Sequence, residues 1–407
     1  MKEINGGVCA PKGFRAGGIF CGIKPSSQKR DLALIYSEKL CNAAAVFTKN
    51  RVKAASVQLT QKHISAGLLR AIIANSGNAN ACTGDAGHAA ARKMAELAAD
   101  LFAISPGHVA VASTGVIGVP LPIAAIESGI EALGNSLQGD EAGHAAALEA
   151  IMTTDTRKKE CSLEIELDGV PVRLGGMVKG SGMIHPDMAT MLCFITTDAA
   201  VSKQALDAGL RRAVGCSFNR LSVDGDTSTN DTVIIMANGQ AGNVIIEEGT
   251  PAFELFSQAL EKLCVDLARK TARDGEGATK LLTASVSGAK DEETAEKLAK
   301  AVVSSSLVKA ACFGADANWG RVLCAMGYSG ADFEPGEVDV FFAAGGKEVQ
   351  VCQGGVSLAF SEDEAKSLLS QEEITIRIKA GSSSGSAEAW GCDLTYDYVK
   401  INGDYRT

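Results

Sequence analysis

Short apolar runs rich in β-branched residues most constrain what this chain can fold into, because such runs form strands. They occupy residues 32–37, 43–48, 71–76, 109–114, 162–174, 232–239, 337–344 and 373–381. Helical patterns lie between them at residues 85–103, 251–272 and 291–311. An Asp168-Gly169 pair between two alternating runs indicates a hairpin. Since the helices do not alternate strictly with the strands, the sequence predicts an α/β (α+β) fold of layered sheets and helices.

The chain length of 407 residues is typical of two or three domains. No internal repeat or low-complexity linker divides the sequence. The clearest change of pattern falls near residues 190–200, where TTDAAVSKQAL leaves a strand and begins a helix. We therefore expect a domain boundary there.

Charge and cysteine usage exclude several classes of protein. The net charge of −9, without a long run of Lys or Arg, makes nucleic acid and anionic membranes poor candidate partners. The twelve cysteines are scattered, form no CxxC motif and often sit in apolar runs, so we expect buried free thiols in a reducing compartment. The N-terminal residues lack the apolar core of a secretory signal, and no apolar stretch reaches the about 18 residues that span a bilayer. These features predict a cytoplasmic protein.

Four polar or glycine-rich loops adjoin the predicted elements, and rigid scaffolds place functional groups on such loops. They span residues 75–87, 113–120, 222–232 and 313–321. The segment from Asp224 resembles the start of a calcium loop, but its sixth residue is Thr229 and its twelfth is Ile235, not the Gly and Glu of an EF-hand. The sequence also lacks GxSxG, HExxH and GxxxxGK[ST] motifs. No metal site is predicted.

The stretch KGSGMIHPDMATMLCFITTDA, residues 179–199, changes from a glycine loop to an apolar run at Thr190. An internal threonine hydroxyl is a poor nucleophile, but a free α-amine with a pKa of about 7.7–8.0 can take its proton near neutral pH. Small Ala189 gives little steric cover to the carbonyl that this hydroxyl would attack in self-cleavage. From the spacing alone, an alternative to the nucleophile stays open, in which Thr190 is a half-buried strand residue that packs beside Met191 and Phe194.

Long motifs occur in order along almost the whole chain. They are GFRAGGIFCGIK, NSGNANACTG, STGVIG, MTTDT, KGSGMIHPDMATML, SVDGDTSTNDT, DGEGATK, FGADANWGR and YVKINGDYRT. This series resembles the ornithine acetyltransferase family of arginine biosynthesis (bifunctional glutamate N-acetyltransferase / amino-acid acetyltransferase). Asp187 stands where Asn is common in that family, and it adds a negative charge near the expected cleavage point.

The resemblance implies roles for particular residues. Thr190 matches the family's nucleophile and also one of its substrate-contacting positions. The resemblance implies autocleavage between Ala189 and Thr190, which frees the α-amine of Thr190. Thr114 and Gly115 match the pair that stabilises the oxyanion, a role that suits a hydroxyl and a backbone N–H. Further positions match substrate-contacting residues: Thr153, Lys179, Glu276, Asn402 and Thr407. Thr154 is an alternative to its neighbour Thr153.

The family also implies an activity and an assembly. The expected enzyme transfers acetyl from N-acetylornithine to glutamate through an acetyl-threonine intermediate, and acetyl-CoA is a candidate second donor. No cofactor and no metal are expected. Autocleavage would give an N-terminal (alpha) chain, residues 1–189, with the oxyanion loop, and a C-terminal (beta) chain, residues 190–407, which begins with the nucleophile. The two chains are expected to stay together as an (αβ)2 heterotetramer.

Two alternatives are compatible with the residues alone. An autoprocessing Thr-nucleophile amidase or aminopeptidase would activate Thr190 in the same way but give the acyl group to water. A non-catalytic binding protein would keep Thr190 as a packed strand residue and would stay one chain.

Overall fold

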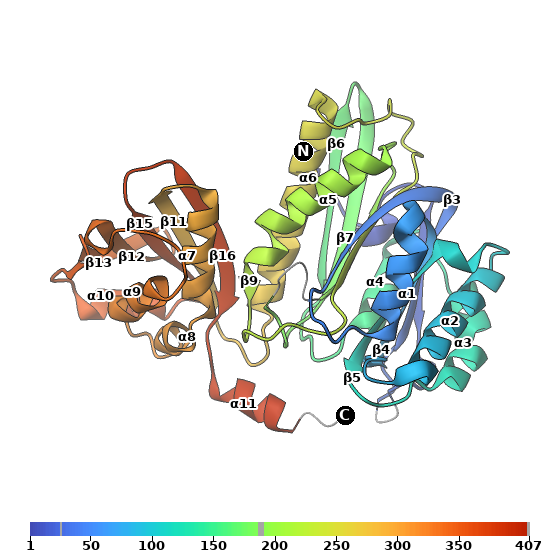
Figure 1. Cartoon of the computed structure of the whole chain (residues 1–407), viewed down its shortest axis with the longest axis horizontal. Coiled ribbons are helices and arrows are strands. Elements are labelled where there is room, and N and C mark those ends of the chain that lie inside the picture. The colour runs from blue at the N-terminus through green and yellow to red at the C-terminus, as the bar shows by residue number, and fades with distance from the viewer. Residues whose placement is uncertain (25–26, 186–190, 405–407) are drawn as a thin grey trace.

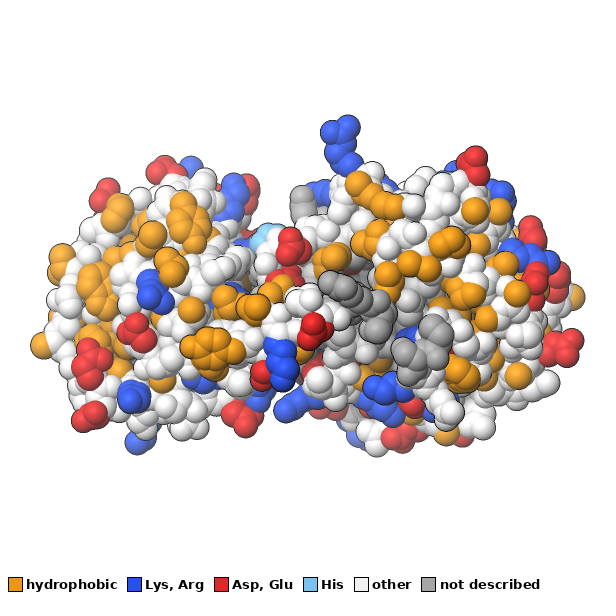
Figure 2. Space-filling view, turned by 90° about the horizontal axis from the view of Figure 1, so that it is seen from below, with side chains coloured by type: hydrophobic (Ala, Val, Ile, Leu, Met, Phe, Trp, Pro, Cys, Tyr) orange, Lys and Arg blue, Asp and Glu red, His pale blue; other side chains and the backbone are white. Residues whose placement is uncertain are grey.

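The molecule has two lobes, with the C-terminal helix beneath and between them (Figure 1). The structure is a computed structural model that describes residues 1–24, 27–185 and 191–404. On the face seen in Figure 2, acidic and basic side chains are interspersed, rather than gathered into one basic surface.

The larger lobe is built on a mixed sheet of nine strands, counted over the described residues. The strand order is β1 (Lys2–Glu3), β6 (Lys159–Leu167), β7 (Val170–Lys179), β8 (Leu192–Thr197), β10 (Thr232–Ala237), β3 (Leu32–Phe47), β4 (Leu68–Asn78) and β5 (Val109–Val116), with β2 (Phe14–Ile19) paired to β3. The pairs β8–β10 and β4–β5 are parallel, and the other pairs are antiparallel.

Helices cover both faces of this sheet, which explains why its central strands β8 and β10 are buried along their whole length. The helices are α1 (Ala55–His63), α2 (Gly84–Asp100), α3 (Ile123–Asn135), α4 (Glu141–Ile151), α5 (Lys203–Cys216) and α6 (Pro251–Arg273). In β8, Cys193 and Ile195 join the core under α5 and α6, whereas Leu192 and Phe194 join the core under α4. Every residue of β8 is therefore buried.

The smaller lobe contains a second sheet, seven-stranded over the described residues. Its order is β14 (Val356–Ser357), β13 (Lys347–Gln353), β12 (Val338–Ala344), β15 (Glu373–Ala380), β11 (Leu281–Ala289), β16 (Gly385–Cys392) and β9 (Leu221–Ser222). Its helices are α7 (Glu292–Ser304), α8 (Ser306–Phe313), α9 (Trp319–Gly327) and α10 (Glu362–Leu369), and α11 (Tyr396–Gly403) follows the last strand. Short 3-10 turns are η1 (Gly7–Cys9), η2 (Ile64–Ala66), η3 (Pro106–His108), η4 (Phe218–Arg220) and η5 (Pro335–Glu337).

The predicted layered α/β (α+β) architecture is confirmed, and the differences lie in the element boundaries. The predicted hairpin is the β6–β7 turn, where Asp168 and Gly169 have φ of 49° and 80°. The runs 32–37 and 43–48 form one strand, β3, with an irregularity in its pairing to β4 rather than a turn. The helical pattern 291–311 is two helices, because Ser305 ends α7 and its hydroxyl accepts a hydrogen bond from the Val308 N–H to cap α8.

The expected domain boundary near residues 190–200 is wrong as a division between lobes. β7, β8 and β10 are neighbours in one sheet, and apart from the two-residue strand β9 the chain passes to the second sheet only after α6. The segment TTDAAVSKQAL is a strand-to-helix turn in which the Ser202 hydroxyl accepts from the Ala205 N–H and caps α5. The division into chains 1–189 and 190–407 is a separate prediction, and its bond lies outside the described residues.

Three expectations from composition can be compared with the structure. All twelve cysteines are free thiols, and most are buried, although Cys82 and Cys324 are exposed. Within residues 1–24, 27–185 and 191–404, no helix combines the length and apolar character that crossing a bilayer requires. In the same residues, no group of three or more His, Cys, Asp or Glu side chains is arranged to hold a metal ion.

Two glycines give a matched test of how tightly the larger lobe packs. In β7, a Cβ on Gly175 would lie 1.8 Å from the carbonyl oxygen of Gly7, so Gly175→Ala forces the backbone apart and should cost about 1–3 kcal/mol or more. In α5, a Cβ on Gly215 meets nothing within 4 Å, so Gly215→Ala should be neutral or stabilise by up to about 1 kcal/mol. Urea unfolding of both variants measures the difference in their free energies of unfolding. Equal urea midpoints would contradict the close contact between Gly175 and Gly7.

Candidate active site

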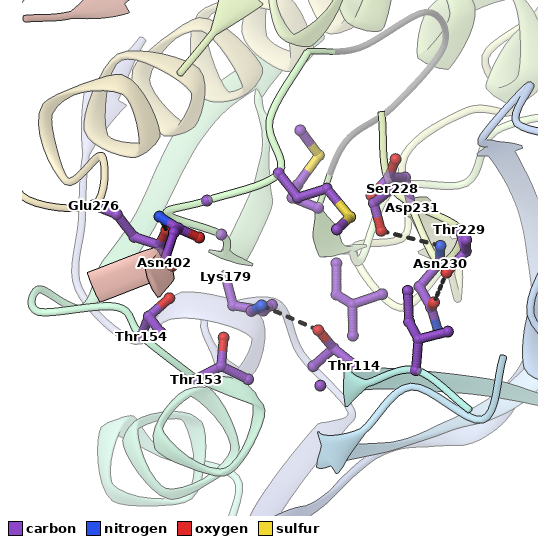
Figure 3. Close-up of a pocket in the computed structure, with 17 residues that line it drawn as sticks. Thr114, Thr153, Thr154, Lys179, Ser228, Thr229, Asn230, Asp231, Glu276 and Asn402 are labelled. Atoms are coloured by element: carbon purple, nitrogen blue, oxygen red, sulfur yellow. Dashed lines mark hydrogen bonds between the residues drawn. The ribbon is translucent and has the colours of Figure 1, made fainter. Parts of the chain in front are cut away.

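One pocket collects residues from several segments of the larger lobe, from the turn after α6 and from the C-terminal helix (Figure 3). It encloses about 130 Å³. Its walls are the end of β5, the turn after α4, the end of β7, the loop before β10, the turn after α6 and helix α11. These segments are far apart in the sequence, so only the tertiary fold assembles the pocket.

The predicted site residues that the structure describes all line this pocket. They are Thr114, Gly115, Thr153, Lys179, Glu276 and Asn402. Thr190, Ala189, Asp187 and Thr407 lie outside the described residues. Met191, the next residue after Thr190 in the chain, lines the same pocket. The structure thus brings the described residues together, and the role of each one stays a prediction.

Gly115 holds the end of β5 in a conformation that other residues rarely adopt. Its φ is +135°, and an added Cβ would lie 2.3 Å from the carbonyl carbon of Gly77 in β4. The parallel pairing of β4 with β5 therefore requires glycine here. This contact sets the position of the Gly115 backbone and of the adjacent Thr114 side chain.

Lys179 is a buried cation directed at Thr114. Its Nζ donates a hydrogen bond of 3.1 Å to the Thr114 Oγ1, and the residue is only 8% exposed. Burial lowers the pKa of Lys179, although the charge of Asp155 opposes this effect. Because the Thr114 oxygen accepts from Lys179, the Thr114 hydroxyl hydrogen is free to donate to another group.

A buried ion cluster beneath the pocket was not predicted from the sequence. Lys159 lies between Asp155 and Asp274, with 2.6 Å from its Nζ to the Asp155 Oδ1 and a second short contact to Asp274. Asp155 also accepts from the backbone N–H groups of Thr153, at 2.9 Å, and Gly180, at 2.7 Å. Burial disfavours the charged form of Asp155, but Lys159 and Lys179 hold its pKa below the usual range.

The cluster joins segments from the two predicted chains. Asp274 accepts from the backbone N–H groups of Thr156 and Arg157, so it binds the turn after α4 to the end of α6. Asp155 and Asp274 belong to the motifs MTTDT and DGEGATK, so the motifs mark the right segments. Periodicity could not reveal that two distant carboxylates share one buried lysine.

Glu276 and Asn402 form one wall of the pocket, opposite Asn230 and Asp231 (Figure 3). The Asn402 Nδ2 donates to the Glu276 Oε2 at 2.8 Å, and the Glu276 N–H donates to the Ser181 carbonyl at 2.9 Å. Asn402 lies on α11, which follows the last strand of the smaller lobe. The C-terminal segment therefore contributes directly to the site.

The two adjacent threonines after α4 differ in their hydrogen bonds. Both line the pocket, but the Thr154 hydroxyl is paired with the Ser181 hydroxyl at 2.7 Å. The Thr153 hydroxyl makes no hydrogen bond to another described residue. Thr153 is thus the better placed of the two to bind a substrate.

The loop of residues 228–231 is a further wall to which the sequence assigned no role. The Asn230 Nδ2 donates to the carbonyls of Ala79, at 2.6 Å, and Ser113, at 2.7 Å, which fixes this loop against β4 and β5. Asp231 also lines the pocket and is only 2% exposed. Burial raises the pKa of the Asp231 carboxyl well above its ordinary value, and Ser228 and Lys179 only partly oppose this shift.

Comparison with known proteins supports a single family. The model of the ArgJ family matches residues 15–407. The chain belongs to the ArgJ family. The arginine biosynthesis bifunctional protein ArgJ of Caldanaerobacter subterraneus subsp. tengcongensis is 52% identical over 407 residues, with 100% of both chains covered. The ArgJ protein of Bacillus subtilis is 48% identical over 408 residues, with 100% of this chain and 98% of that protein covered.

A solved ArgJ structure gives the same assignment. The crystal structure of the ArgJ protein from Bacillus halodurans is 43% identical, with a TM-score of 0.50, and it covers 52% of this chain and 98% of the solved one. The family membership that the motifs indicated is therefore confirmed. The chain also spans nearly the full length of the ArgJ relatives named above.

The buried cluster predicts a stability effect that a surface pair lacks. Lys159→Met leaves two buried carboxylates without their cation, which should cost about 3–5 kcal/mol. Urea unfolding at pH 7 gives the change. Lys297→Met is the control, because Lys297 pairs with Glu293 on an exposed helix face and its loss should move the midpoint far less. Equal shifts in the two variants would contradict the role of the cluster.

The stability of Lys159→Met relative to the wild type should change with pH in a defined direction. In the wild type, the lowered pKa of Asp155 contributes stability above the unfolded value of about 3.9, and this stability is lost as the pH falls through the folded value. In Lys159→Met, Asp155 stays buried without this cation, which should raise its pKa. Protonation of Asp155 then removes the free-energy cost of its buried charge. The stability gap between wild type and variant should shrink from pH 7 to pH 4, and a growing gap would contradict the assignment.

Proposed function

We propose that this chain transfers the acetyl group of N-acetylornithine to glutamate through acetyl-Thr190, as a bifunctional enzyme of arginine biosynthesis. One observation carries the proposal: a hydroxyl, a glycine backbone with positive φ, a buried cation and a carboxylate converge on the pocket that Met191 lines. The names of the ArgJ relatives support the pathway. The proposed nucleophile is the residue bonded to Met191.

In the first half-reaction, the Thr190 α-amine takes the hydroxyl proton and the Thr190 oxygen attacks the acetyl carbonyl. The Thr114 hydroxyl and the Gly115 N–H donate to the developing oxyanion. The hydrogen bond from Lys179 to the Thr114 oxygen supports this role, because it leaves the hydroxyl hydrogen to point elsewhere. Ornithine leaves, and acetyl-Thr190 remains. The glutamate amine then attacks this ester and carries the acetyl group away, which gives ping-pong kinetics.

The charges of the pocket fit amino-acid substrates. N-acetylornithine carries a carboxylate and a side-chain ammonium, and glutamate carries an amine and two carboxylates. Lys179 provides a cation for a carboxylate, and Glu276 with Asn402 provides a carboxylate and an amide. The free hydroxyl of Thr153 adds a neutral hydrogen-bonding group, and Thr407 is proposed to complete the site from the C-terminus.

Self-cleavage between Ala189 and Thr190 would create the α-amine that the mechanism needs. The two fragments would have 189 and 407 − 189 = 218 residues. They would stay together, because strands on both sides of residue 189 share one sheet. The solved Bacillus halodurans chain covers about half of this chain, which is compatible with a cleaved relative. We propose an (αβ)2 heterotetramer as the assembly.

The remaining proposals concern donors, cofactors and location. We propose acetyl-CoA as a second acetyl donor, in line with the bifunctional relatives, and no metal or tightly bound cofactor. Exchange of one amide for another needs no redox group, and attack by an activated hydroxyl needs no metal. Free cysteines fit a reducing compartment, which supports a cytoplasmic location.

An acetyl-transfer assay tests the proposed reaction. Purified protein with N-acetylornithine should form N-acetylglutamate only when glutamate is present, and ornithine release should follow glutamate concentration. An amidase would instead release ornithine equally fast without glutamate. Intact mass under denaturing conditions should show the two fragments, and Thr190→Ala should show one uncut chain. A single uncut wild-type chain with full activity would refute the α-amine as the base.

The oxyanion role of Thr114 predicts a selective loss of rate. Thr114→Val keeps the shape of the side chain but removes the hydroxyl, so kcat with N-acetylornithine should fall by about 10²–10³. Thr114→Ser keeps the hydroxyl and should retain most of the activity. Similar rates in the two variants would contradict the assignment, and intact masses would show whether each protein had been cleaved before the assay.

A further inference from the structure

Asp231 is a buried acid in the pocket that the mechanism above does not use. One of its oxygens, Oδ2, has no hydrogen-bond partner in the part of the chain that the structure describes. The residue is 2% exposed and lines the pocket together with Thr114, Gly115 and Met191. A buried carboxyl oxygen without a partner is costly, and in a pocket a ligand group or a catalytic role accounts for such an atom.

The backbone around Asp231 is fixed from both sides. Asn230 is bound to the ends of β4 and β5 through the carbonyls of Ala79 and Ser113. The Thr232 N–H donates to the Met191 carbonyl at 2.8 Å, and the Thr48 N–H donates to the Asp231 carbonyl at 3.0 Å. The backbone that carries the Asp231 side chain is therefore held at one place in the wall, next to the strand that begins after Thr190.

Burial favours a neutral Asp231 carboxyl in the pocket without substrate, and the nearby positive charge only partly opposes this effect. Lys179 is the cation whose charge acts on Asp231. Lys179 is itself attracted by Asp155 and Glu276 and repelled by Lys159. Glu276 lies on the opposite side of the pocket from Asp231 (Figure 3). Two acidic groups thus face the substrate space from opposite walls, with Lys179 between them.

In both half-reactions the atom that changes is the nitrogen whose bond to the acetyl carbon breaks or forms. It is the acetylated nitrogen of N-acetylornithine in the first half-reaction and the amine nitrogen of glutamate in the second. That nitrogen offers an N–H in both half-reactions, gains a proton when ornithine leaves and loses a proton when glutamate attacks. We propose that Asp231 binds this nitrogen and carries that proton, as a catalytic acid and base distinct from the Thr190 amine. This inference rests on the proposed acetyl transfer.

The proton balance closes over one cycle. When the C–N bond of N-acetylornithine breaks, the nitrogen takes the Asp231 proton, the carboxylate forms, and the Thr190 amine holds the hydroxyl proton. The neutral glutamate amine then attacks the ester, a new C–N bond forms and the C–O bond breaks. The nitrogen gives one proton to Asp231, and the Thr190 oxygen recovers its proton from the Thr190 amine. Both groups return to their starting forms.

The test compares acetyl donors that differ in their need for a proton. Asp231→Asn keeps the shape but removes the exchangeable acid. With N-acetylornithine, its acylation rate should fall by about 10²–10⁴. With p-nitrophenyl acetate, whose leaving group departs as an anion, acylation should stay within about threefold of wild type, since no proton is transferred to the leaving group. Asp226→Asn is the control, because Asp226 is an exposed acid in the same loop and should change neither rate.

An equal loss with both donors, or no loss with N-acetylornithine, would overturn the assignment. A second measurement needs no variant: the wild-type acylation rate with N-acetylornithine should fall at high pH as the acid ionises, whereas the rate with p-nitrophenyl acetate should lack that decline. Identical alkaline limbs for both donors would also overturn it. If wild-type protein makes no N-acetylglutamate at all, the proposed function fails; if it does and the donor difference is absent, only the Asp231 role fails.

Discussion

Lys159 is a cation buried between two carboxylates, and the shape of the active-site pocket depends on this arrangement. Asp155 and Asp274 lie more than a hundred residues apart in the sequence, and each also accepts hydrogen bonds from backbone N–H groups. Ion pairs of this kind tolerate little displacement, since an unpaired buried charge is costly. The turn after α4, the end of β7 and the end of α6 are therefore held at fixed separations beneath the substrate space.

The same cluster has a consequence for a protein that is cut in two. Asp155 and Lys159 would belong to the first fragment, and Asp274 would belong to the second. The large sheet is divided in the same way, with β7 before the proposed cleavage point and β8 after it. The fragments therefore share a core and a pocket, so neither one contains the complete site. Association of the fragments is a property of the fold rather than of a separate interface.

Opposite pKa shifts in one small volume suit a reaction that moves protons. Burial disfavours charge on both Lys179 and Asp231, so each is displaced toward its neutral form. The hydrogen bond from Lys179 to Thr114 connects this electrostatic balance to the proposed oxyanion donor.

The family, the element types and most of the pocket residues could be predicted from the sequence. The motifs around Thr114, Thr153 and Glu276 identified segments that the fold does bring together, because their residue types serve chemistry rather than periodicity. Local patterns also predicted the β6–β7 hairpin, since Asp168-Gly169 suits only a few turn conformations. The true lobe boundary and the single long strand β3 could not be seen, because both depend on pairing between distant segments.

Which charges are buried and which are paired depends on the three-dimensional fold. Lys159, Asp231 and Asp274 have the appearance of ordinary polar residues in the sequence, yet each is buried beside or beneath the pocket. The reason is physical: the energy of a charge depends on its solvent exposure and on neighbours a few ångströms away, and a linear pattern specifies neither. Sequence names the chemical groups, and the fold sets their protonation states and their partners.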